Sequence, residues 1–321
     1  MELYRIDYEL YSATASAWQA DTISGHLCWA LRYTEGEGAL ARFLDACRQG
    51  RPPILVSNGF PAGLFPRLRV PPAPLDTTAT LENQRRQSME EKEARKIDHL
   101  TLEEFNNTIN GMLVRPSRKA EISQRVTLKN QINRITGTTG ESGELYEFEE
   151  FRCPAVSIYA RIENDFIETA RTLFSFIADN GYGKRKSVGY GAISSMSFAP
   201  LEGLNPPEDA NGFVSLSNFV PARADPVVGS WDTIIKYGKL GEEYALEKSA
   251  FKKPVMMLTA GSTFYDSPVK PFYGRMVPGV SYSYPQVVQY GFALPVPARL
   301  PSMAASISAG LPRKRKAAVR K

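Results

Sequence analysis

The stretch AVSIYARIENDFIETARTLFSFIADNGYGKRKSVGYGAISSMSF, residues 155–198, contains the pattern that decides the fold. Its first eight residues are rich in β-formers and predict a strand. Residues 164–181 then place apolar side chains one helical turn apart, and Gly181 stands where a helix would end. Residues 189–198 predict a second strand. The stretch is therefore a strand–helix–strand unit with a glycine-rich, basic loop before its last strand.

A similar unit opens the chain. Residues 2–11, ELYRIDYELY, alternate apolar and polar side chains, which predicts a half-buried strand. Residues 21–33, DTISGHLCWALRY, form one apolar stripe at helical spacing, and ILVS at 54–57 predicts the next strand. The order strand–helix–strand, given twice, predicts the ferredoxin-like plan: an α+β fold whose four-stranded antiparallel sheet carries two helices on one face.

A long insert, residues 70–150, separates the two halves. A proline-rich connector leads into a mixed-charge segment, 82–105, that predicts one helix. Residues 115–134 then carry six basic side chains against Glu121 alone, which makes this segment a candidate anion-binding region. The segment TGTTGESGELY, 136–146, has the turn chemistry of a hairpin tip. Because a connection of this length is seldom without a function, we predict that the insert is functional and consists of a helix and a hairpin.

Residues 1–204, which include the insert, form the predicted N-terminal domain. The rest of the chain divides into two parts. Residues 205–300 contain short apolar segments separated by glycine and proline, and predict a smaller β-rich C-terminal domain. Residues 301–321 form a basic tail that we predict to be disordered. Its six positive side chains account for the net charge of +5, because without them the chain sums to −1. The tail either attracts a polyanion or serves as a soluble end.

Composition excludes several classes of protein. No apolar run approaches the ~18 residues of a spanning helix and no leader is recognisable, so we expect no membrane contact and a cytoplasmic location. Cys28, Cys47 and Cys153 are far apart, without a CxxC pair, which argues against disulfides and a cysteine zinc site. His26 and His99 are the only histidines in the sequence. We therefore expect no metal and no cofactor.

The glycine-rich loop, residues 179–193, fits no nucleotide-binding motif. A Walker A loop requires a glycine before its lysine, and Arg185 stands there; the GxGxxG fingerprint fails because Lys186 occupies its last glycine position. Two interpretations stay open on the residues alone. Glycines that admit a close anionic chain, with Lys184, Arg185 and Lys186 on phosphates, describe a nucleic-acid clamp. A glycine helix cap followed by a solvated basic turn describes a structural loop.

In the first interpretation, aromatic side chains also take part. Tyr182 and Tyr190 flank the basic residues and are candidates for stacking on bases.

Several stretches make the chain similar to the RAMP superfamily of CRISPR-associated proteins, which are built from ferredoxin-like domains. Within it, the chain most resembles the family of the fourth, Cas-five-like subunit of type III-A (Csm) effector complexes. The basic tail is a departure from the family pattern. The stretches that carry the resemblance are ADTISGHLCWALR (20–32), PPILVSNGFPAGLFPRLRVP (52–71), KNQINRITGTTGESGELY (129–146), GYGKRKSVGYG (181–191) and YGFALPVP (290–297).

The resemblance implies two ferredoxin-like (RRM-like) modules, the first with a thumb-like insert at 70–150. It also implies a non-catalytic subunit that holds the 5′ repeat-derived tag of the crRNA and bridges a large Cas-ten-type subunit to the backbone RAMP subunit of the filament, with target RNA contacted indirectly. Carried over by position, the expected RNA-binding residues are Ser24, His26, Lys129, Asn130, Asn133, Arg134, Gly181, Tyr182, Gly183, Lys184, Arg185, Lys186, Ser187, Gly189 and Tyr190.

Three alternatives remain. A crRNA-processing endoribonuclease would use a histidine as general acid or base, and only His26 lies near the expected groove. We predict a positioning role for His26, and an inert His99 on an exposed helix. A purely structural interaction protein would not respond to RNA. The equivalent subunit of a type III-B or III-D complex is a nearer alternative.

Overall fold

The computed structural model of the 321-residue chain describes most of the sequence. The described residues are 1–71, 80–94, 96–112, 114, 116, 120, 122–130, 132, 135–136, 138, 145–246 and 249–301. Two predicted RNA-binding residues, Asn133 and Arg134, lie outside them, as do residues 302–321 of the basic tail and most of the basic side chains of 115–134.

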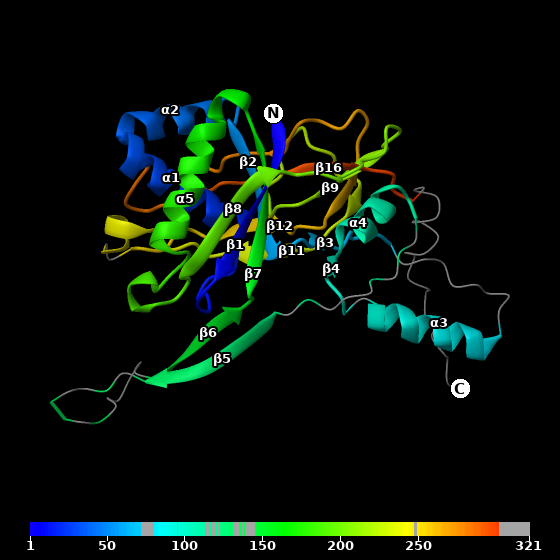
Figure 1. Cartoon of the computed structure of the whole chain (residues 1–321), viewed down its shortest axis with the longest axis horizontal. Helices are drawn as coiled ribbons and strands as arrows, with labels where there is room; N and C mark the ends of the chain where they lie inside the picture. The colour runs from blue at the N-terminus through cyan, green and yellow to red at the C-terminus, as the bar shows by residue number, and fades with distance from the viewer. Residues whose placement is uncertain are drawn as a thin grey trace, which may run out of the picture.

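The first sheet has the strand order β2-β7-β1-β8 (Figure 1). Every pairing in it is antiparallel. Helix α1, followed by α2 (Glu37–Arg48), lies between the first two strands of this sheet in the chain, and α5 lies between the last two. Apart from the added α2, this is the ferredoxin-like plan expected from the sequence. The elements are β1 (Glu2–Leu10), α1 (Ala20–Glu35), β2 (Ile54–Pro61), β7 (Ala155–Ile162), α5 (Ile167–Asn180) and β8 (Ile193–Pro200).

Alternation along β1 determines which face of the sheet the helices cover. Tyr4, Ile6 and Tyr8 are buried beneath α1 and α5, and the Tyr8 hydroxyl donates to the main-chain oxygen of Phe174 at 2.8 Å. Arg5 projects from the opposite face and is exposed. A second helix on this layer, α2 (Glu37–Arg48), follows α1 directly, and a short 3-10 turn (Asn164–Phe166) precedes α5.

The other face of the sheet is covered in part by the start of the insert. Tyr159 of β7 stacks on Phe65, whose ring also stacks on Phe105. Two short strands pair here and a helix follows them. These elements are β3 (Phe65–Pro66), β4 (His99–Leu100) and α4 (Leu102–Ile109).

The single helix predicted over 82–105 is therefore wrong in its extent. Helix α3 (Leu81–Ala94) ends early, and a new helix begins at Thr101, whose hydroxyl and the Glu104 carboxylate form a capping box. Between the two helices, His99 lies in β4, partly buried beside the Phe60 ring, and not on an exposed helix as predicted.

The hairpin predicted in the insert is present. Strands β5 (Ser123–Asn130) and β6 (Leu145–Arg152) pair antiparallel, from Ser123 opposite Arg152 to Asn130 opposite Leu145. The hairpin projects away from the sheets, on the side toward which the glycine-rich loop points (Figure 1).

The second region is β-rich, as expected. Its main sheet has the order β10-β13-β9-β16, and two small ribbons, β11-β12 and β14-β15, accompany it. Described residues 205–301 contain no α-helix, so a second complete ferredoxin-like module is not confirmed. The elements are β9 (Gly212–Ser215), β10 (Gly229–Ser230), β11 (Thr233–Lys236), a 3-10 turn (Glu242–Leu246), β12 (Val255–Leu258), β13 (Thr263–Tyr265), β14 (Tyr273–Gly274), β15 (Phe292–Ala293) and β16 (Pro295–Ala298).

The two regions share one core. Val214, Leu216 and Leu294 are fully buried in the same cluster as the side chains of β1, β2 and α1. Asn58 of β2 donates its main-chain N–H to Leu216 O at 2.9 Å and its side-chain amide to Asn218 Oδ1 at 2.9 Å. The second region therefore packs directly against the first sheet.

A buried polar junction joins the same two regions. Asp21, in the first turn of α1, accepts a hydrogen bond from Gln289 at 2.7 Å, and its Oδ2 lies 3.2 Å from the Lys236 ammonium. Both charged side chains are largely buried.

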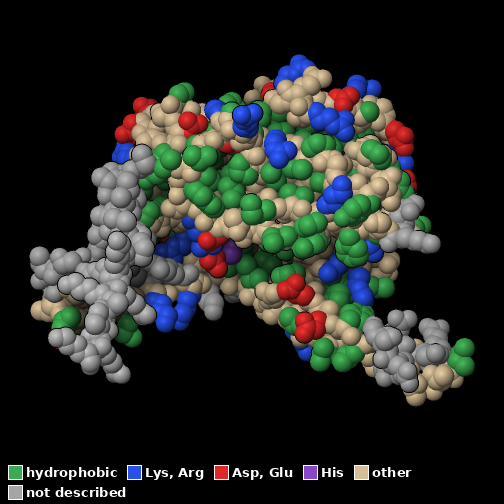
Figure 2. All heavy atoms as spheres, turned by 180° about the vertical axis from the view of Figure 1, so that it is seen from behind, with side chains coloured by type: hydrophobic (Ala, Val, Ile, Leu, Met, Phe, Trp, Pro, Cys, Tyr) green, Lys and Arg blue, Asp and Glu red, His purple; other side chains and the backbone are tan. Residues whose placement is uncertain are grey.

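On the surface turned away from the viewer of Figure 1, many apolar side chains are visible (Figure 2).

Candidate nucleic-acid interface

The neck of the glycine-rich loop is closed by the main chain. Tyr182 N–H donates to Gly191 O at 2.9 Å, and Gly181 N–H donates to Ile177 O at 2.8 Å. Gly191 has φ +69°, and a Cβ added there would lie 1.9 Å from Tyr182 O. A glycine is therefore required at this position, both for its backbone angle and for the space. Between the two ends of the neck, residues Lys186–Val188 form one 3-10 turn.

Tyr182 anchors the loop to the protein interior. Its ring is fully buried and stacks on Trp18, with centroids 3.6 Å apart and planes 8° from parallel. Its hydroxyl donates to Ala17 O at 2.8 Å. The expectation that Tyr182 stacks on an RNA base is corrected, because both its ring and its hydroxyl are already used inside the protein.

His26 holds the loop from the α1 side. Its Nε2 accepts the Gly183 N–H at 3.0 Å. Burial, with a smaller contribution from the Lys186 charge, lowers the pKa of His26 to about 3, so the ring is neutral and its Nε2 is an acceptor. This is the positioning role predicted for His26.

Ser24, two residues earlier on the same helix, is buried, with 5% of its surface exposed. Its predicted contact with RNA is corrected, because its side chain belongs to the buried stripe of α1.

The hairpin and the loop meet through one face of the hairpin. Lys129 of β5 lies opposite Tyr146 of β6, and Phe148 is two residues further along the same face. Arg185 donates to the Tyr146 hydroxyl at 2.9 Å, and its guanidinium carbon lies 4.8 Å from the Phe148 ring centroid. Lys129 donates to the Tyr190 hydroxyl at 2.9 Å and lies 3.8 Å from the Phe148 centroid.

Two segments far apart in the sequence thus form one basic and aromatic junction. We call Lys129, Tyr146, Phe148, Arg185 and Tyr190 the hairpin–loop junction.

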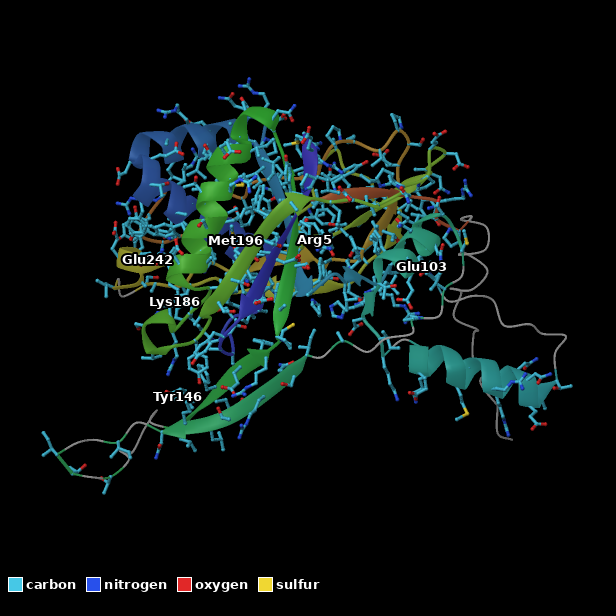
Figure 3. All side chains as sticks on the ribbon, viewed as in Figure 1. Arg5, Glu103, Tyr146, Lys186, Met196 and Glu242 are labelled. Atoms are coloured by element: carbon cyan, nitrogen blue, oxygen red, sulfur yellow. The ribbon has the colours of Figure 1, made fainter. Side chains whose placement is uncertain are left out.

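The three consecutive basic side chains of the loop have different environments. Lys184 is exposed, and its ammonium forms no ion pair with a described residue, while its main-chain N–H donates to Ser16 Oγ at 3.1 Å. Arg185, with φ +64°, is exposed and turned to the hairpin. Lys186 is partly buried, and its ammonium lies 3.2 Å from the Glu242 carboxylate. Both side chains are labelled in Figure 3.

Other predicted residues are placed as a binding surface requires. Ser187 and Gly189 are exposed on the loop, and Asn130 is exposed at the end of β5. Gly181 and Gly183, with φ +77° and +81°, shape the loop at buried or partly buried positions. The structure thus brings the loop residues together with Lys129 and, through Gly183, with His26.

A groove of about 820 Å³ lies beside the junction. The end of β1, the base of the hairpin and the glycine-rich loop form its walls. Most of the lining residues were missed from the sequence, among them Tyr11, Glu150, Arg152 and Val188. Glu150, one of the three carboxylates in the stretch EFEEF at 147–151, is only 7% exposed. The available signal was alternation, because Glu150 shares a face with Phe148.

The described residues offer neither a metal cluster nor a membrane-spanning helix. They contain no group of three His, Cys, Asp or Glu side chains arranged to hold a metal ion. No helix among them is both long and apolar enough to cross a membrane.

A ferredoxin-like sheet with a basic glycine-rich loop before its last strand and a long insert is compatible with the RAMP fold, and solved structures share the fold of this chain. The chain aligns with one in the crystal structure of a Csm1–Csm4 cassette bound to AMPPNP, with TM-score 0.63 and 17% identity over 94% of this chain and 100% of the other. The cassette bound to cA4 gives the same values.

A second kind of assembly gives the same result. The Csm3–Csm4 subcomplex of a type III-A CRISPR–Cas interference complex aligns with TM-score 0.60 and 13% identity, over 92% of this chain and 99% of the other. The matched subunit, Csm4, is common to both assemblies, and this protein has the Csm4 fold. No protein-family model and no curated protein matches the sequence. The resemblance drawn from the sequence is thus confirmed at the level of the fold.

Proposed function

We propose that this protein is a non-catalytic, RNA-binding subunit of a type III-A CRISPR interference complex. In this role it holds the 5′ repeat-derived tag of the crRNA where the glycine-rich loop meets the hairpin. The observation that carries the proposal is the hairpin–loop junction, in which Arg185 and Lys129 hold two segments together around Phe148 and leave a groove at their side.

The chemistry of this surface suits a single strand. Single-stranded RNA is recognised through its phosphates, stacked bases and 2′-hydroxyls. Lys184 offers an exposed ammonium without an ion pair to any described residue, and the exposed residues Ser187 and Gly189 allow close approach to the main chain. Tyr11, which is 84% exposed, offers a ring for stacking in place of the buried Tyr182. Asn133 and Arg134 remain part of the proposed thumb by resemblance only.

No observation favours the nuclease alternative. A general base needs a nitrogen free to take a proton from its substrate. His26 uses Nε2 to accept the Gly183 N–H, and His99 lies in β4, apart from the loop in sequence and element. We therefore propose that the chain does not cut RNA.

The proposed partners are a large Cas-ten-type subunit and the backbone RAMP subunit, bridged by this chain in the cytoplasm, with the target RNA contacted indirectly. The support is the fold shared with Csm4, whose solved structures are of assemblies with Csm1 and with Csm3. Large apolar side chains exposed in the second region, among them Val227, Ile235 and Met256, are suited to contact with another protein.

The test is co-purification from cells that express a crRNA array with the neighbouring effector genes. Retained RNA would be sequenced, and the chain alone would be incubated with repeat RNA. A uniform repeat-derived 5′ tag, with no cleavage by the lone chain, is the expected result. Cleavage by the lone chain would move the assignment to the nuclease, and an intact assembly without RNA would leave only a scaffold.

A further inference from the structure

Glu150 is the acidic side chain among the residues that line the groove, and Arg152 is the basic one. Glu150 lies on β6 opposite Arg125 and lines the groove, with its side chain 9% exposed. Its Oε2 accepts a hydrogen bond from the Tyr190 hydroxyl at 3.3 Å. Its Oε1 has no hydrogen bond from a described residue, and the Nε of Arg152 lies 3.8 Å away, beyond hydrogen-bond distance. The carboxylate is therefore held from one side and keeps an acceptor available to the groove.

A carboxylate at this position determines which part of an RNA the groove can take. An ionised carboxylate only accepts hydrogen bonds and repels phosphate, so the floor of the groove does not suit the RNA backbone. Bases of single strands are splayed out and recognised by hydrogen bonds to their edges. The occupant that fits is a base that donates to Glu150 while its phosphates lie on the surrounding basic side chains.

Among the four bases, guanine fits a carboxylate best. Its Watson–Crick edge presents two adjacent donors, N1–H and the N2 amino group, which can reach one carboxylate together. Adenine and cytosine place a bare ring nitrogen beside their single amino group, and uracil flanks its one N–H with two carbonyl oxygens. In each of these three bases an acceptor would face the carboxylate and be left unpaired, which would make binding less favourable in free energy.

The walls of the groove suit an aromatic base. Tyr11, Ile122 and Val188 line it with apolar surface, and all three are exposed. Arg152 stands at the same site with an exposed guanidinium. We propose that this groove binds one unstacked guanine of the bound RNA, and that Glu150 recognises its Watson–Crick edge. The inference rests on the proposed RNA-binding function and adds a base preference to it.

The experiment measures binding of the full-length chain to short RNAs. The probes are octauridylate, eight octamers with one guanosine at each position in turn, and the same eight with inosine, which lacks only the N2 amino group. We expect one guanosine position to bind about tenfold more tightly than octauridylate, the range of a hydrogen-bonded pair with a charged group. Inosine at that position should lose most of this gain.

Variants then assign the preference to one side chain. Glu150→Gln should abolish the guanosine preference, so that every guanosine octamer binds the variant as tightly as octauridylate does. Glu150→Asp keeps the charge, shortens the reach and should also reduce the preference. Glu147→Gln is the matched control, because it makes the same charge change at an exposed position on the opposite face of β6. Thermal unfolding of each variant reports whether the hairpin face is intact.

The outcomes separate the two proposals. If no octamer binds, the RNA-binding function is overturned and the base preference with it. If all octamers bind equally, RNA binding stands and the guanine site is overturned. If the preference persists in Glu150→Gln, the role of Glu150 is overturned.

Discussion

Replacing Lys184 by glutamine should lower the salt dependence of RNA binding by about one phosphate contact. On a single strand, each contact contributes roughly 0.7 to the slope of log K against log salt concentration. Lys184 should contribute this full amount, because its ammonium is exposed and forms no ion pair with a described residue. Lys186 should contribute less, because it must first leave Glu242, which lies 3.2 Å away.

Replacing all three basic residues of the loop should change the slope of log K against log salt concentration by a larger amount. Exchanging Lys184, Arg185 and Lys186 for glutamine should flatten the slope by at most about 2. Between about 50 and 200 mM salt, a fourfold range, the natural chain should then lose up to about 16-fold more affinity than the variant, since four squared is 16. Replacing Arg185 should also weaken RNA binding by changing the shape of the site, because Arg185 donates a hydrogen bond to Tyr146 of the hairpin.

The assay is fluorescence anisotropy of a labelled single-stranded RNA titrated at several salt concentrations. Arg48→Gln is the control, because Arg48 is an exposed arginine on α2, outside the loop and the hairpin. An unchanged slope in the triple variant would show that these residues do not touch phosphate, and would refute the proposed clamp. Glu242→Gln should have the opposite effect, because it releases Lys186.

Three further predictions concern stability, each measured by urea unfolding. Gly191→Ala should lower the free energy of unfolding by at least ~2 kcal/mol, since the added Cβ would meet a main-chain oxygen. Gly189 has φ +90° but open space around it, so Gly189→Ala should lower this free energy by less. Equal losses in the two variants would contradict the role of the neck. The pKa of His26 is about 3 in the fold and ordinarily 6.5, so the unfolded chain takes up a proton that the folded chain does not. The free energy of unfolding should therefore fall as pH drops from about 6.5 toward 3, by up to ~1.4 kcal/mol per pH unit, and His26→Gln should remove this component; a pH profile unchanged by the substitution would contradict a neutral, buried ring. Asp21→Ala should lower the free energy of unfolding by ~3 kcal/mol, because the largely buried Lys236 ammonium then keeps only the neutral acceptors Gln19 and Thr22, and a loss below ~1 kcal/mol would contradict a strong charge interaction at this junction.

The sequence predicts the first sheet well and the insert less well. Alternation over residues 2–11 and the apolar stripes of the two connecting helices are local signals, and β1, α1 and α5 follow them. The break in the insert helix at Thr101 was also a local signal, since Thr101 and Glu104 have capping-box spacing. Strands of two to four residues in the second region leave little periodicity to detect, so its sheet order was not predictable.

The candidate site was predictable only in part. Composition identifies the loop, and the resemblance adds Lys129. Neither indicates that Tyr182 points inward onto Trp18 while Tyr190 stays at the surface, because both flank the same basic run. Glu150 could be assigned to the groove only once the pairing of β5 with β6 was known, since that register decides which alternate side chains face the loop.

Strand β1 is synthesised first and pairs late. Both of its neighbours, β7 and β8, lie beyond residue 154. At roughly 5–20 residues per second, the ribosome needs about 10–40 s to complete the two hundred residues that end with β8. Throughout that time Tyr4, Ile6 and Tyr8 lack the sheet and the second helix that bury them. The nascent chain thus exposes an apolar strand edge for tens of seconds, which makes it a natural client of ribosome-associated chaperones.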